Sequence, residues 1–225
     1  MPSSIVHLRV CDALLDLIDE KYHVDFTVGN LAPDCGRPVP GTKSYDPPRN
    51  VTHFTDMPQR WNTRTHPERF YEDHLSKARD MRDFVFMLGY YCHLRVDNAY
   101  IDLFFEHFSS LYGEAFDLDM RRRIKQRDQN YHDAVFITEH PDFRPRVILD
   151  SIGGYPNRCL DYYSADAITE RLIKVKHNEL TAVPGEMPGD LMVSAEYCDG
   201  FIRECACVLR GFITDELDRT NCIKH

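Results

Sequence analysis

The feature that most constrains this chain is a nine-residue apolar run, FVFMLGYYC at 84–92, inside a longer pattern of helical spacing. A helix that is apolar on every side has no face for solvent, so it must pass through the core. This pattern covers 82–112, and further helical patterns cover 4–20, 67–80, 117–138, 164–180 and 189–217. Alternating apolar and polar residues, which are typical of strands, form no convincing run. We therefore predict an all-α fold with 82–112 as its central helix.

A long segment at 28–67 interrupts the helices, because it is rich in proline and glycine. An irregular segment of this length inside a compact domain is usually functional or disordered. Shorter stretches at 140–157 and 181–189 also carry proline and glycine, and we predict them as loops. Neither an internal repeat nor a break in composition divides the 225 residues. The sequence therefore predicts a multi-helix bundle that forms one domain over residues 1–225.

The central helix carries two ionisable residues on its apolar side. At about 100° per residue, Arg95, Asp102 and Glu106 form one polar stripe, whereas His93 and Asp97 lie on the opposite side. Burial of such groups is costly unless they are paired or bind a metal. At positions i and i+4, the two side chains point to the same region of space. A metal site and a buried His–Asp hydrogen bond are the two interpretations.

Three more residues have the chemistry of metal ligands. His7 lies on the apolar side of the first helical pattern, and one metal centre would explain both His7 and His93. The irregular segment adds Asp34, in a Pro-Asp-Cys-Gly turn that is also an ordinary turn sequence, and His53. Gly89 lies one turn before His93 and leaves space for another ligand to approach. Zinc prefers nitrogen and oxygen ligands of these kinds, and a carboxylate can bridge two ions.

Four motifs follow one another in the first half of the chain. An early helical histidine, His7, precedes F-x-V-G-N-x-A-P-D, which ends at Asp34; T-H-F around His53 comes next, and F-x-x-G-Y-x-x-H-x-x-x-D ends at Asp97. In order and spacing over about residues 5–101, the chain resembles the zinc-dependent phospholipase C family. The resemblance implies a helical bundle of that type, with the proline- and glycine-rich segment near the metal site.

The resemblance also implies a function and a set of ligands. Members of the family use zinc to activate water against a phosphoester. By motif, Asp34, His53, His93 and Asp97 would hold one zinc ion, and Asp97 would bridge to a second ion bound by His7. Asp34 would be the catalytic carboxylate that takes the proton of the attacking water. The later H-x-x-x-E of the secreted members has no good counterpart here, so we expect one or two zinc ions rather than three.

A second ionisable pair, Asp128 and His132, is spaced i and i+4 in the predicted helix 117–138. We expect this pair to bind another ion, to orient a ligand or to hold a phosphate of the substrate, or else to form an ordinary ion pair on the helix surface. The adjacent His132 and Asp133 suggest a different class, an HD-type phosphohydrolase, although Asp133 falls on the predicted polar side of its helix. A third alternative is a non-catalytic metalloprotein, in which the ion fastens the irregular segment to the helices.

Charge and hydropathy limit the expected partners. The chain has 27 Lys and Arg against 36 Asp and Glu, a net charge of −9, which argues against a broad nucleic-acid or anionic-membrane surface. No run approaches eighteen apolar residues, so we expect no transmembrane segment. The opening MPSSIVHLRV lacks the pattern of a signal peptide, and we expect a cytoplasmic protein. The expected ligand is a small phosphoester or a phospholipid headgroup.

Overall fold

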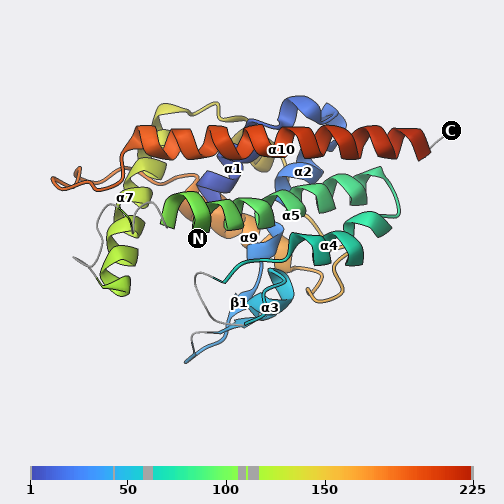
Figure 1. Cartoon of the computed structure of the whole chain (residues 1–225), viewed down its shortest axis with the longest axis horizontal. Coiled ribbons are helices and arrows are strands. Elements are labelled where there is room, and N and C mark those ends of the chain that lie inside the picture. The colour runs from blue at the N-terminus through green and yellow to red at the C-terminus, as the bar shows by residue number, and fades with distance from the viewer. Residues whose placement is uncertain (1, 43, 58–62, 106–109, 111–116, 224–225) are drawn as a thin grey trace.

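The computed structural model describes residues 2–42, 44–57, 63–105, 110 and 117–223, and these residues are mostly helical (Figure 1). The longer helices are α1 (Ser4–Asp12), α2 (His23–Gly29), α4 (Pro67–Asp73), α5 (Met81–Ala99), α7 (Leu118–Glu139), α8 (Arg144–Asp150), α9 (Ala167–Lys174) and α10 (Ala195–Ile223). The structure also has the short helix α3 (Arg49–Thr52), several 3₁₀ and π-helical segments, and the strands β1 (Arg37–Pro38) and β2 (Tyr45–Asp46), which pair antiparallel. The prediction of an all-α fold is confirmed.

Helix α5 is the central helix of the protein. It begins after Asp80, whose side chain accepts a hydrogen bond from the backbone N–H of Asp83 and caps the first turn. From Phe84 to Leu94 every residue is buried, as the apolar run predicted. Helices α2, α4 and α10 pack against it, and Figure 1 shows α10 running alongside α5 with α4 on the other side.

Two glycines allow α2 and α5 to cross in close contact. A Cβ atom at Gly29 would lie 2.1 Å from the carbonyl oxygen of Phe86, and one at Gly89 would lie 2.3 Å from the carbonyl oxygen of Phe26. The sequence suggested that the side chain of another metal ligand fills the space beside Gly89. The backbone of α2 fills this space instead. This crossing holds Asn30, the residue that follows α2, against α5.

Several helices end earlier than their apolar patterns do. The pattern at 4–20 is not one helix: α1 is followed by 3₁₀ turns at Leu15–Leu17 and Glu20–Tyr22. The ring Nε2 of His23 lies 3.0 Å and 2.9 Å from the carbonyl oxygens of Leu15 and Ile18, so the side chain of His23 supplies a partner where the helix stops. The pattern at 82–112 becomes π-helical at Tyr100–Phe105, and its residues 106–109, 111 and 112 lie outside the described residues.

Three helices lie where the sequence analysis predicted none. Helix α2 was not predicted, the short helix α3 lies inside the segment 28–67 that was predicted as irregular, and α8 lies inside the stretch 140–157 that was predicted as a loop. Pro145 occupies the first turn of α8, where a backbone N–H has no partner inside the helix and proline is tolerated. A proline is therefore compatible with the start of a helix, although it is also typical of loops. The predicted helices 164–180 and 189–217 correspond to α9, with its π-helical extension Val175–Glu179, and to α10.

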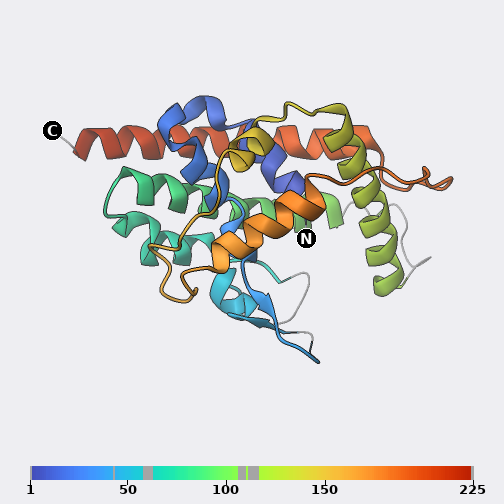
Figure 2. The same ribbon diagram turned by 180° about the vertical axis from the view of Figure 1, so that it is seen from behind.

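The back of the molecule is shown in Figure 2, where α9 crosses in front of the other elements and α7 stands at one end. Helix α9 packs against the 3₁₀ turn Ala32–Asp34, which follows α2. In the part of the chain that the structure describes, each helix is too short or too polar to span a lipid bilayer.

Candidate metal centre

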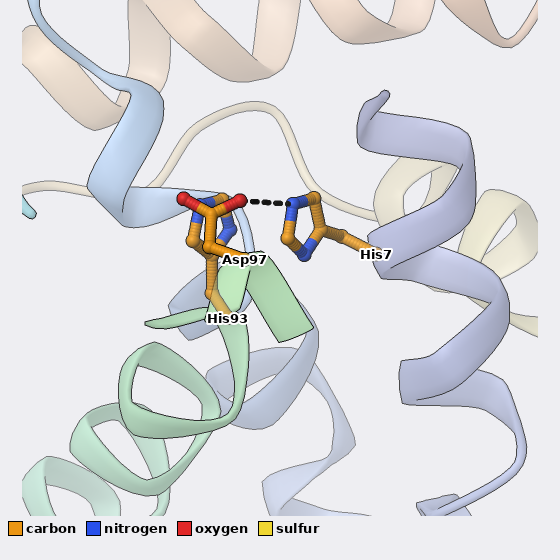
Figure 3. Close-up of side chains that lie close together, drawn as sticks. All are labelled: His7, His93 and Asp97. Carbon is orange, nitrogen blue, oxygen red and sulfur yellow. Dashed lines mark ion pairs between the residues drawn. The ribbon is translucent and has the colours of Figure 1, made fainter. Parts of the chain in front are cut away.

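The side chains of all five predicted ligands meet beside the α2–α5 crossing. They come from four separate elements: α1, the turn Ala32–Asp34, the end of α3, and α5. Among the described residues, two sets of ligand atoms lie within 4.8 Å of one another and could each hold a metal ion. These sets are His7, His93 and Asp97, and Asp34, His53 and His93. Figure 3 shows the first set, with His7 facing Asp97 from the opposite helix.

The Asp97 carboxylate lies between three imidazoles. Its Oδ1 is 3.5 Å from Nε2 of His7 (Figure 3), and its Oδ2 is 3.7 Å from Nε2 of His53 and 3.9 Å from Nε2 of His93. Most of these separations are too long for direct hydrogen bonds. Ligands of tetrahedral zinc lie about 2.0–2.2 Å from the ion, which places them roughly 3.4 Å from one another. The separations of 3.5–3.9 Å around Asp97 are therefore close to those between ligands that share an ion.

Asp34 forms the open side of the centre. Its Oδ1 lies 3.2 Å from Nε2 of His53, and its side chain is 24% exposed. The other four side chains are only 0–3% exposed. A water molecule or a substrate can therefore approach the centre from the side of Asp34.

Hydrogen bonds outside the centre fix the orientation of two imidazoles. Nδ1 of His93 donates to the backbone carbonyl of Asn30 at 2.8 Å, and Nδ1 of His53 lies 2.8 Å from the Thr52 hydroxyl. A carbonyl can only accept, so the proton of a neutral His93 is on Nδ1 and Nε2 presents its lone pair. The ring of His7 stacks on the ring of His93, with centroids 3.7 Å apart and planes 5° from parallel.

The inner atoms of the centre lack hydrogen-bond partners among the described residues. These buried atoms are both ring nitrogens of His7, Nε2 of His53, Nε2 of His93 and Oδ1 of Asp97. A buried polar atom without a partner costs about 1–3 kcal/mol, so a cluster of them requires an explanation. Imidazole nitrogens and a carboxylate that face one another are the donor set of a zinc site, and a bound ion would satisfy them together. The residues present therefore fit the metal.

The pKa values of the centre favour the protonation states that a metal needs. Burial, together with the adjacent His7, lowers the pKa of His93 to about 3, and burial also lowers the pKa of His53. Burial alone would raise the pKa of Asp34 and of Asp97, but the neighbouring histidines outweigh it and hold both below their ordinary values. At neutral pH, His53 and His93 are therefore neutral and both carboxylates are ionised.

Arg49 also belongs to the centre, and the sequence analysis did not identify it. Its Nη2 lies 3.5 Å from Oδ2 of Asp97, its Nη1 lies 3.7 Å from Oδ1 of Asp34, and its side chain is 25% exposed. Arg49 begins α3, and its carbonyl accepts a hydrogen bond from the backbone N–H of His53 at 2.7 Å. The sequence feature that could have identified Arg49 is its position four residues, about one helical turn, before the predicted ligand His53.

A pocket of about 630 Å³ opens beside the centre, and Asp34 lines it. The rest of its wall comes from the beginning of α1, from α7, and from α9 with the segment that follows it. The lining is about half polar, and its polar residues include Ser3, Ser4, Asn130, Tyr131, Asp133, Arg171, Asn178 and Glu179. Its volume lies in the range of ordinary small-molecule sites, about 300–1,000 Å³.

The structure does not bring Asp128 and His132 into the centre. Asp128 is fully buried and accepts hydrogen bonds from the backbone N–H groups of Met192 and Val193 at 2.8 Å and 3.0 Å. Nε2 of His132 lies 2.7 Å from the carbonyl oxygen of Val193. The pair therefore fastens the segment before α10 to α7. Neither residue belongs to the two ligand sets found among the described residues.

The helical pattern placed Asp133 on the solvent-facing side of its helix, but in the structure this residue is buried. It is 8% exposed, because the beginning of α1 covers it, and Ser3 is its hydrogen-bond partner. Burial raises the pKa of Asp133 to about 7. His132 and Asp133 form no metal-binding group with other described residues, as an HD-type site would require.

We compared the chain with sequence profiles of protein families, with curated proteins and with solved structures, and found no match.

Proposed function

We propose that the protein is a zinc-dependent hydrolase of phosphoesters, with a helical bundle of the zinc-dependent phospholipase C type. The observation that carries this proposal is the convergence of three buried imidazole Nε2 atoms on two carboxylates, without hydrogen bonds that would satisfy them. A buried His–Asp hydrogen bond, the other interpretation of the sequence, would leave fewer of these atoms unpaired. The ordered motifs from His7 to Asp97 support the same assignment.

The five residues divide naturally between two ions. Nε2 of His53, Nε2 of His93, Asp34 and Oδ2 of Asp97 would hold the first, and Oδ1 of Asp97 with Nε2 of His7 would hold the second. The second set has fewer protein ligands, so we expect weaker binding there and a content of one or two zinc ions. When bound, zinc lowers the pKa of a coordinated water toward about 7 and polarises a phosphoryl oxygen.

Asp34 is the residue that would accept a proton during hydrolysis. It is ionised at neutral pH, it is the most exposed of the five ligands, and it lines the pocket. A carboxylate oxygen of Asp34 would take the proton of the attacking water while the oxygen of that water bonds to phosphorus and the ester P–O bond breaks. The leaving oxygen would depart as the alcohol after it takes up a proton from water or from Asp34. The pocket would hold the alcohol part of a small soluble phosphoester, or the headgroup of a phospholipid.

Zinc content tests the proposal directly. We expect one or two zinc ions per chain by elemental analysis of the untagged protein, and their loss in Asp97→Asn. Asp102→Asn is the matched control, because Asp102 lies just beyond α5 but is 42% exposed and pairs with Arg64. A folded protein that takes up no zinc when it is supplied would overturn the proposal.

Hydrolysis of bis(p-nitrophenyl) phosphate then separates an enzyme from a metal-stabilised protein. In the zinc-loaded enzyme, Asp34→Asn should lower kcat by about 10²–10⁴-fold at saturating zinc, because a positioned base is lost. If zinc only fastens the irregular segment to the helices, the wild-type protein will be inactive against phosphoesters, and Asp34→Asn will lower its stability instead.

A further inference from the structure

We propose that Arg49 binds the phosphoryl group of the substrate and that, before metal binding, its guanidinium balances the charge of the two carboxylates. This inference rests on the proposed function of the same centre. Arg49 is the first residue of α3 and His53 is the residue that ends it, and a 2.7 Å hydrogen bond joins their backbones. Arg49 is thereby fixed relative to a ligand.

The contacts of Arg49 show what it does without a metal. Its two terminal nitrogens reach Asp34 and Asp97 at 3.7 Å and 3.5 Å, at or beyond the limit of hydrogen bonding. These are long ion pairs with the same carboxylates that would hold the first zinc. A zinc ion bound there would neutralise both carboxylates and repel the guanidinium. Arg49 and zinc therefore compete for the charge of Asp34 and Asp97.

The exposure of the centre shows what Arg49 can do once a metal has replaced it. Asp34 and Arg49 are 24% and 25% exposed, whereas His7, His53 and Asp97 are almost fully buried. Of these residues, Asp34 and Arg49 are therefore the two that a substrate can reach from solvent. A guanidinium presents planar, paired N–H donors that match two phosphoryl oxygens. Arg49 can bind two non-bridging oxygens while Asp34 takes the proton of water.

This placement selects the class of substrate. The guanidinium needs a phosphoryl group with negatively charged non-bridging oxygens, which phosphomonoesters and phosphodiesters have. A neutral phosphotriester or a carboxylic ester would leave the charge of Arg49 uncompensated beside the zinc ions. We therefore assign the centre to anionic phosphoesters.

The test measures two affinities in Arg49→Met, Arg49→Lys and wild type: zinc by competition with a chelator, and inorganic phosphate by calorimetry on the zinc-loaded protein. In Arg49→Met we expect zinc to bind about threefold or more tightly, because a competing cation is gone. Phosphate should bind about tenfold more weakly, because two charged hydrogen bonds are lost. Arg49→Lys keeps the charge without the planar donors, so zinc affinity should stay near wild type and phosphate affinity should fall about threefold.

Arg37→Met is the matched control, because Arg37 is exposed and pairs with Glu170 outside the centre. It should leave both affinities unchanged. Weaker zinc binding in Arg49→Met would show that Arg49 holds the ligands in place, and it would overturn the proposal. Unchanged phosphate binding in Arg49→Met and Arg49→Lys would also overturn it, while the zinc-dependent function would stand. If the wild-type protein binds no zinc, the proposed function itself fails, and this inference fails with it.

Discussion

Replacement of Gly89 by alanine should weaken both the fold and the candidate centre. Alanine favours a helix interior over glycine by about 1 kcal/mol. Against this gain, the new methyl carbon would lie 2.3 Å from the carbonyl oxygen of Phe26, more than 1 Å inside ordinary contact, and a backbone atom cannot rotate away. Overpacking of this kind costs about 1–3 kcal/mol or more, and a clash with backbone belongs at the upper end. We therefore expect a net loss of about 2 kcal/mol.

Thermal unfolding measures this loss, and α10 provides the control. For a chain of this size 1 kcal/mol corresponds to about 2–4 °C, so Gly89→Ala should lower Tm by about 4–8 °C. Gly211→Ala makes the same change inside α10, where no heavy atom lies within 4 Å of the new methyl, and it should raise Tm slightly. Zinc affinity should fall about tenfold in Gly89→Ala only, because Asn30 would move away from His93. Equal stability of the two variants would refute the close crossing of α2 and α5.

Three further predictions concern stability. Asp128→Ala should lower the free energy of unfolding in urea by about 3 kcal/mol with zinc content unchanged, because it leaves the buried N–H of Val193 and the partly buried N–H of Met192 unpaired. A loss of phosphate affinity without a loss of stability would instead show a binding role. His93 takes up a proton below about pH 6.5 in the unfolded chain, but only near pH 3 in the folded protein. The free energy of unfolding of the metal-free protein should therefore fall by about 1 kcal/mol between pH 7 and pH 5.5. A smaller fall is expected in His93→Gln. Removal of zinc by a chelator should lower the Tm of the zinc-loaded wild type by about 5–10 °C and leave the Tm of Asp97→Asn unchanged. An equal fall in Tm in both proteins would show that the zinc binds elsewhere.

The central helix and the positions of its two ionisable residues were predictable from the sequence. In α5 the apolar run, the helical period and the burial agree, so His93 and Asp97 could be placed on its inner side. The same reasoning placed His7 correctly on the buried side of α1. Asp133 was misplaced, because helical periodicity does not show that the beginning of α1 covers that side of α7.

Other parts of the centre depend on tertiary contacts that leave little trace in a linear pattern. The carbonyl of Asn30 orients His93, but every residue has a carbonyl, so the sequence cannot show which one is used. The role of Gly89 depends on the approach of α2, a helix whose apolar pattern is too short to stand out. Asp128 and His132 have the spacing of a functional pair, yet backbone groups far along the chain satisfy them.

The proposed metal ligands and most of the wall of the pocket beside Asp34 come from different parts of the chain. All five proposed ligands lie between His7 and Asp97, whereas most of the pocket wall comes from residues 126–134 and 171–188. Mutations in those later stretches can therefore change which molecules enter without altering a ligand. A lineage of such proteins could diversify in substrate while its metal chemistry stays constant, and a designer could alter selectivity by varying the second half of the chain alone.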